Sequence, residues 1–129
     1  MKQTISLLIA LWLTCVAALP AEEVTRVFLF AGQSNMVGAD AHAERIDDYP
    51  EFRGAGSPQA DVLYSYILGD GSEASKGWVP LKPLSSVGPE VTFARRIRQH
   101  VRFPVAIIKS AIGGTTVAFD WNPEAPEQG

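Results

Sequence analysis

The chain has 129 residues, a formal net charge of −3 and a hydrophobic share of 47%. This length fits one domain. The densest basic stretch, Arg95–Arg98, lies on a predicted helix, so the sequence gives no sign of a nucleic-acid partner.

Residues 1–21 have the pattern of a secretory signal peptide. Lys2 gives a short positive start, and the apolar core Ile5–Val16 is too short to span a membrane and lacks a basic stop-transfer flank. We predict cleavage between Ala18 and Glu22, a mature domain over residues 22–129, a secreted or periplasmic location and no stable membrane span. A permanent N-terminal anchor is the alternative. The single cysteine, Cys15, lies in this segment, so the mature chain is expected to form no disulfide.

The apolar run Val27–Ala31 predicts a buried parallel strand. It breaks at Gly32, and Ser34 follows directly. Ligands of open α/β sheets bind beyond the carboxyl ends of the strands, so a hydroxyl at this turn is a candidate nucleophile. Ordinary turn chemistry, which also uses Gly, Ser and Asn, is the alternative explanation.

The middle of the chain contains a long polar stretch and a predicted hairpin. Val37–Pro58 is expected to be an irregular excursion with one helical turn, and a loop of this length next to Ser34 is expected to form one wall of a substrate site. Asp61–Leu68 predicts a second strand, and Trp78–Leu81 predicts a short return strand at the sheet edge.

A helix and a further strand follow. Gly88–Glu90 has the features of a helix start, with apolar residues continuing at helical spacing to Val101. Val105–Ile108 predicts a buried strand that leads into a glycine-broken loop, Lys109–Thr116. If this strand and the first one are adjacent and parallel, both loops lie at one sheet edge. One loop then supplies a nucleophile and the other a backbone N–H for an oxyanion.

Three blocks resemble a known family. They are Gly32–Met36 (Gly-Gln-Ser-Asn-Met), Gly88–Glu90 with the following Phe-Ala, and Lys109–Thr115. Together they resemble the sialate O-acetylesterase-like branch of the SGNH hydrolases, which includes the acetylxylan esterases of carbohydrate esterase family six. The resemblance runs from about Val27 to Trp121.

The resemblance implies an α/β fold, a three-layer αβα sandwich on a parallel sheet that is incomplete in this chain. It implies that Ser34 is the nucleophile and an oxyanion donor through its N–H, and that Gly113 is the second oxyanion donor. It also implies substrate contacts by Gln33, Asn35 and Gly114, an acetylated carbohydrate substrate, and no cofactor or metal.

The resemblance also leaves gaps. The family places a third oxyanion donor in a later Trp-x-Gln-Gly-Glu segment and its base in an Asp-x-x-His, and this sequence contains neither. His42, in a polar loop, is expected to be a solvated residue, and His100 to suit a helix carboxyl end. Lys109 is an alternative base, but pairing with a carboxylate or carbonyl is the preferred interpretation. Glu90 is expected to have a structural or loop-positioning role.

The sequence therefore predicts a secreted carbohydrate O-acetylesterase piece that lacks its base and is nearly inactive alone. A non-catalytic carbohydrate-binding module or pseudoenzyme is the alternative. Four aromatic residues could stack on a sugar or pack in the core or at the sheet edge: Tyr64, Tyr66, Trp78 and Trp121. A flavodoxin-like anion-binding domain is a third possibility, but no phosphate-binding glycine pattern supports it. The two histidines are too far apart to predict a metal site, and the sequence leaves the oligomeric state open.

Overall fold

The computed structural model describes residues 24–124. The predicted signal peptide, residues 1–21, lies outside the described residues. The elements, in chain order, are β1 (Arg26–Gly32), α2 (Ser34–Val37), the 3₁₀ helices η1 (Ala43–Asp48) and η2 (Pro50–Phe52), β2 (Gln59–Leu68), β3 (Glu73–Ala74), β4 (Val79–Leu81), α3 (Pro89–Arg98) and β5 (Val105–Ala111).

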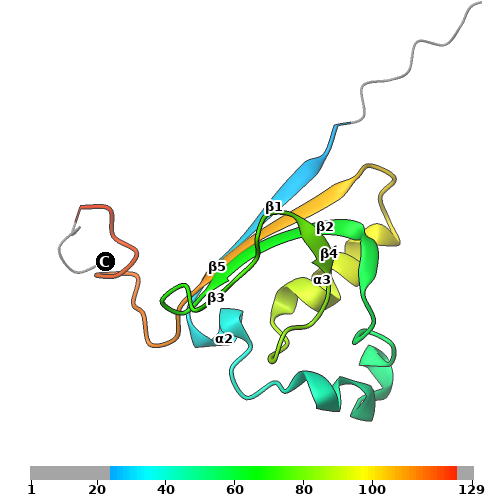
Figure 1. Ribbon diagram of the computed structural model, residues 1–129, viewed down its shortest axis with the longest axis horizontal. Coiled ribbons are helices and arrows are strands. Elements are labelled where there is room, and N and C mark those ends of the chain that lie inside the picture. Colours follow the sequence, from blue (N-terminus) through cyan, green and yellow to red (C-terminus); the bar gives the residue numbers. More distant parts are fainter. Residues whose placement is uncertain (1–23, 125–129) are drawn as a thin grey trace, which may run out of the picture.

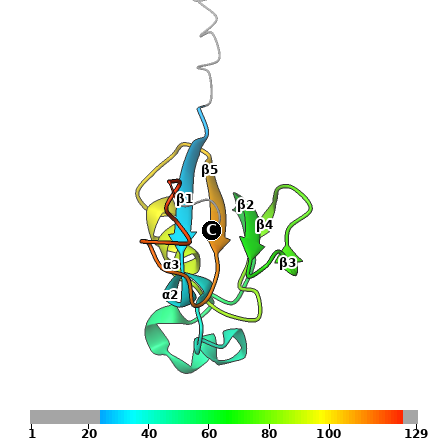
Figure 2. The ribbon, with the colours of Figure 1, turned by 90° about the vertical axis from the view of Figure 1, so that its left-hand side faces the viewer.

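The strands form one sheet that is mostly parallel (Figures 1 and 2). Its order is β1-β5-β2-β3, and β4 pairs with β2. β5 is parallel to both β1 and β2, whereas β3 and β4 run antiparallel to β2. The chain reaches β5 from β2 through α3, so the α/β class and the predicted parallel arrangement are confirmed.

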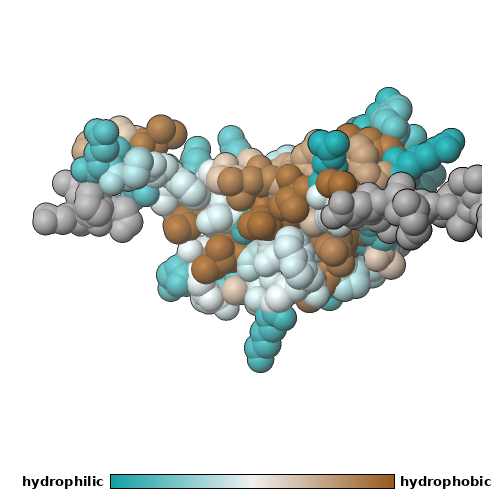
Figure 3. All heavy atoms as spheres, turned by 90° about the horizontal axis from the view of Figure 1, so that it is seen from above, coloured by the Kyte–Doolittle hydropathy of each residue, from teal (hydrophilic) through white to brown (hydrophobic). Residues whose placement is uncertain are grey.

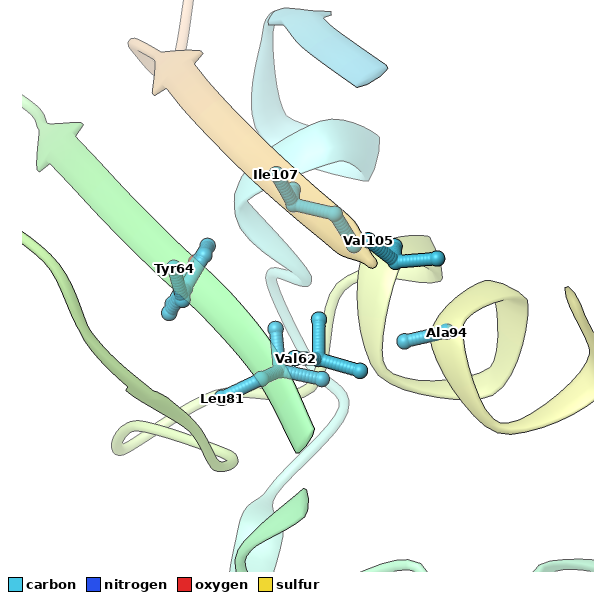
Figure 4. Packing of buried hydrophobic residues seen from close by; sticks show 6 residues of the cluster. All are labelled: Val62, Tyr64, Leu81, Ala94, Val105 and Ile107. Atoms are coloured by element: carbon cyan, nitrogen blue, oxygen red, sulfur yellow. The ribbon is translucent and has the colours of Figure 1, made fainter. Parts of the chain in front are cut away.

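One face of the sheet packs against α3. The core joins side chains from β2, β4, β5 and α3, and Figure 4 shows six of them: Val62, Tyr64, Leu81, Ala94, Val105 and Ile107. Phe93 of α3 reaches under β1, where its ring meets Phe28 and Phe30 edge-on at centroid distances of 4.9 and 5.2 Å. Alternate residues of β1, β2 and β5 therefore lie on the face that α3 covers.

The opposite face of the sheet is apolar and exposed. Leu29 is 70% exposed, and the same face carries Val27, Leu63, Ile67 and Ile108. Figure 3 views the molecule from above the orientation of Figure 1 and shows hydrophobic residues gathered there. The prediction that Val27–Ala31 is a buried strand is therefore wrong: β1 lies at the edge of the sheet and none of its residues is buried. Within residues 24–124 the architecture thus has two layers, a sheet and the helices on one face. No helix in this described part is long and apolar enough to cross a membrane.

Several element boundaries differ from the predictions. β5 continues to Ala111, so the prediction that Lys109–Ala111 belongs to a loop is wrong. Lys109 continues the register with both neighbouring strands, opposite Phe30 of β1 and Tyr66 of β2, and its side chain is buried. α3 ends at Arg98, before Val101, and the excursion after α2 contains two short 3₁₀ helices in place of one helical turn.

Candidate active site

Ser34 begins α2, directly beyond the carboxyl end of β1. Gln33 caps this helical turn, and its Oε1 accepts hydrogen bonds from Ser34 Oγ at 2.9 Å and Ser34 N–H at 3.3 Å. The turn closes at Gly38, whose N–H donates to the Ser34 carbonyl at 3.0 Å. Gly38 has a φ of 93° and lies so close to the backbone of Val87 that a Cβ would collide with it. Glycine is therefore required where the Ser34 turn meets the chain before α3.

The loop after β5 starts beside the Ser34 turn. Gly32 is opposite Ala111 in the parallel register, and Ile112 N–H donates to the Gly32 carbonyl at 3.0 Å. Gly113 and Gly114 follow, both exposed, with open space where a Cβ would be. The prediction that the two glycine loops lie at one sheet edge is confirmed. The catalytic roles of Ser34 and Gly113 stay predictions.

The loop that carries Gly113 is held by its own side chains. Thr115 Oγ1 donates to the Ile112 carbonyl at 2.8 Å and accepts from Trp121 Nε1 at 2.8 Å. Thr116 N–H donates to Asp120 Oδ2 at 2.7 Å, and this hydrogen bond lowers the pKa of the Asp120 carboxyl. Trp121 therefore has a local anchoring role in this structure.

A buried ion pair lies beneath the Ser34 turn. Lys109 Nζ lies 2.8 Å from Glu90 Oε1, and both residues are about 1% exposed. Lys109 Nζ also donates to the carbonyl of Val37, the last residue of α2, at 3.3 Å. Ser86 Oγ donates to the same carbonyl at 2.9 Å. The end of α2 is thus tied to β5 and to the segment before α3.

The rest of the Glu90 carboxylate is tightly enclosed. Tyr64 Oη is 3.5 Å from Glu90 Oε1, and burial, with the nearby Glu90 charge, raises the pKa of Tyr64. Glu90 Oε2 is buried and has no hydrogen-bond partner among the described residues. Gly88 leaves room for this pair, because a Cβ there would collide with Glu90 Oε2 and Lys109 Nζ. The structure thus supports pairing for Lys109 and a structural role for Glu90.

Neither histidine is placed against Ser34. His42 forms an isolated antiparallel bridge with Ser86, and His100 lies just beyond α3, where its N–H donates to the Ile97 carbonyl. Within residues 24–124, the hydrogen-bond acceptor of the Ser34 hydroxyl is the Gln33 amide, which is no base. The same part of the chain contains no cluster of three His, Cys, Asp or Glu residues that could hold a metal ion.

The remaining candidates are spread over different places. Asn35 is exposed on α2. Tyr64 is fully buried in the core, and the ring of Tyr66 stacks on it at 5.0 Å. Trp78 is 50% exposed next to β4.

A pocket of about 380 Å³ lies between the polar excursion and the start of α3. Two aromatic residues in its wall, Tyr49 and Phe52, were not among the candidates derived from the sequence. The sequence feature that could have identified them is an aromatic pair within a polar loop, in the stretch that we expected to form one wall of a substrate site.

Comparison with known proteins identifies a family. No curated protein and no solved structure matches this chain. The model of the family described as "Carbohydrate esterase, sialic acid-specific acetylesterase" matches residues 24–128, which is most of the chain and includes the blocks around Ser34, Glu90 and Gly113. The chain therefore belongs to this carbohydrate esterase family.

Proposed function

We propose that this protein is a secreted or periplasmic serine esterase that removes acetyl groups from carbohydrates, with Ser34 as its nucleophile. The family supports an acetylesterase-type function and acetylated carbohydrate substrates. In the proposed reaction Ser34 Oγ bonds to the acetyl carbonyl carbon, and the C–O bond to the sugar breaks. The sugar oxygen leaves with a proton, and water then releases acetate from the acetyl-enzyme.

The observation that carries this proposal is the pairing of β1 and β5. It brings Ser34 and the exposed glycines of the loop after β5, Gly113 and Gly114, to one sheet edge, beyond the ends of two adjacent strands. The N–H groups of Ser34 and Gly113 would stabilise the oxyanion. Since Gln33 Oε1 accepts from Ser34 N–H in this structure, the acetyl oxygen has to replace it as the acceptor.

The general base is proposed to come from an Asp-x-x-His, which these 129 residues do not contain. A serine hydroxyl is a weak nucleophile without a base, so the chain alone is expected to react slowly. The third layer of an αβα sandwich belongs to the same proposal. The exposed apolar face with Val27, Leu29 and Leu63 supports it, because parallel sheets are normally covered on both faces.

An esterase assay of the purified chain with 4-nitrophenyl acetate tests the proposal. We expect a low rate that Ser34→Ala abolishes and that Ser57→Ala, a change at an exposed loop serine, leaves intact. A rate that Ser34→Ala does not change would exclude Ser34 as the nucleophile. A high rate that depends on Ser34 would instead show that these residues already contain a sufficient base.

The absence of a base next to Ser34 among the described residues favours a second candidate, a carbohydrate-binding protein without catalysis. In that case the chain binds sugar, Ser34→Ala does not alter the binding, and no acetate is released from any acetylated carbohydrate.

A further inference from the structure

The pocket beside α3 combines aromatic and polar side chains. Its volume of about 380 Å³ lies in the range of small-molecule sites. We infer that it binds a neutral pyranose ring, as one unit of the carbohydrate whose acetyl group Ser34 attacks. This inference rests on the proposed function for the choice of a carbohydrate, and on the pocket's own residues for the rest.

The apolar part of the pocket fits the face of a sugar ring. Tyr49 and Phe52 lie edge-to-face with centroids 6.4 Å apart, and they are 49% and 38% exposed. The C–H groups of a pyranose present an apolar face that packs on an aromatic ring, while the tyrosine hydroxyl offers a hydrogen bond. Ile46 and Val87 line the same pocket and add to its apolar surface.

The polar part of the pocket fits the hydroxyl groups of a neutral sugar. Asp40, His42 and Arg45 line the pocket together. Arg45 Nε is paired with Asp48 Oδ2 at 3.3 Å, which orients the guanidinium and leaves its terminal N–H groups to donate. Because the charge of Arg45 is already paired with Asp48 and Asp40 adds a second carboxylate to the wall, the pocket carries no excess positive charge that would attract an anionic ligand.

Residues that line the pocket also lie next to the turn that carries Ser34. Asp40 comes two residues after Gly38, which closes that turn, and Val87 N–H donates to the Ala41 carbonyl at 2.8 Å. Gly88 forms part of the pocket and also packs against the Met36 carbonyl of α2. A sugar unit in this pocket therefore lies on the segment that positions the proposed nucleophile.

The test is a nuclear magnetic resonance titration of the ¹⁵N-labelled chain with xylotetraose, a neutral oligosaccharide, and separately with N-acetylneuraminic acid, an anionic sugar. We expect xylotetraose to shift the amides of residues 40–52 and to bind more tightly than the anionic sugar. Tyr49→Ala is expected to weaken binding about tenfold, the loss of one aromatic contact. Tyr49→Phe keeps the ring but removes the hydroxyl, so it is expected to weaken binding less than Tyr49→Ala does. Trp78→Ala, a change at an exposed tryptophan outside the pocket, is expected to bind as the original chain does.

Three results would overturn the inference. They are no shift in residues 40–52 with xylotetraose, tighter binding of N-acetylneuraminic acid, and binding that Trp78→Ala weakens while Tyr49→Ala does not. The amide spectrum of each variant shows whether it is folded. Ser34→Ala separates this inference from the proposed function. Suppose that Ser34→Ala still binds xylotetraose and also keeps the esterase rate of the original chain. Ser34 is then not the nucleophile, whereas the inference that the pocket binds a sugar is unaffected.

Discussion

Lys109 Nζ and Glu90 Oε1 form a buried ion pair at 2.8 Å directly beneath the turn that carries Ser34. The same ammonium group donates to the carbonyl of Val37, the last residue of that turn. One cation thus connects the end of β5, the first turn of α3 and the end of α2. A lysine held in this way has a structural partner for its charge, which argues against its use as a base for Ser34.

Removing the cation is expected to be costly. Lys109→Met keeps a side chain of similar length but leaves the Glu90 carboxylate buried without its partner. We expect a loss of about 3–5 kcal/mol in the free energy of unfolding, measured by urea denaturation. The double variant Lys109→Met/Glu90→Gln is expected to recover part of this loss, because a neutral amide replaces the unpaired charge. A loss below about 1 kcal/mol in the single variant would show that the pair is not closed in solution.

Gly88→Ala tests how closely the segment before α3 packs on this pair. The added Cβ would collide with Glu90 Oε2 and Lys109 Nζ and would lie 2.6 Å from the Met36 carbonyl. We expect a destabilisation of about 1–3 kcal/mol in urea denaturation. Gly113→Ala is the matched control, because its Cβ would meet open space, and we expect a change within about 0.5 kcal/mol. Equal stability of both variants would mean that Gly88 is not packed as described.

Asp120 gives a pH prediction for the Gly113 loop. Thr116 N–H donates to its carboxylate and lowers its pKa, so we expect this carboxyl to titrate below its ordinary value of about 3.9. A lowered pKa means that the contribution of the hydrogen bond is present above the unfolded-state pKa. The contribution is lost as the pH falls through the folded-state pKa. The ¹³C chemical shift of the Asp120 carboxyl, followed by nuclear magnetic resonance across the pH range, measures this pKa. A pKa at or above the ordinary value would show that the hydrogen bond from Thr116 is not formed in solution.

The sequence allowed most of the elements to be predicted, because their signals are local. The apolar run of β1 and the Gly-Pro-Glu start of α3 each depend on neighbouring residues. The end of β5 could not be read locally, because Lys109 is buried there and its partner, Glu90, lies nineteen positions earlier in the chain.

The candidate site was predictable in part for the same reason. Ser34 and the Gly113 loop follow strands that are recognisable by themselves, so their meeting at one edge required only the correct strand order. For the pocket around Tyr49, the sequence predicted that the excursion forms a wall but not which residues line it, because Asp40, Arg45 and Phe52 meet the start of α3 only through the tertiary fold.

Trapping the acetyl-enzyme shows whether Ser34 is the nucleophile. The purified chain is incubated with an excess of 4-nitrophenyl acetate, quenched in acid, digested and examined by mass spectrometry. We expect one acetyl group on the peptide that contains Ser34, and none on that peptide in the Ser34→Ala variant. Acetylation of other residues only, with the Ser34 hydroxyl left unmodified, would contradict this expectation.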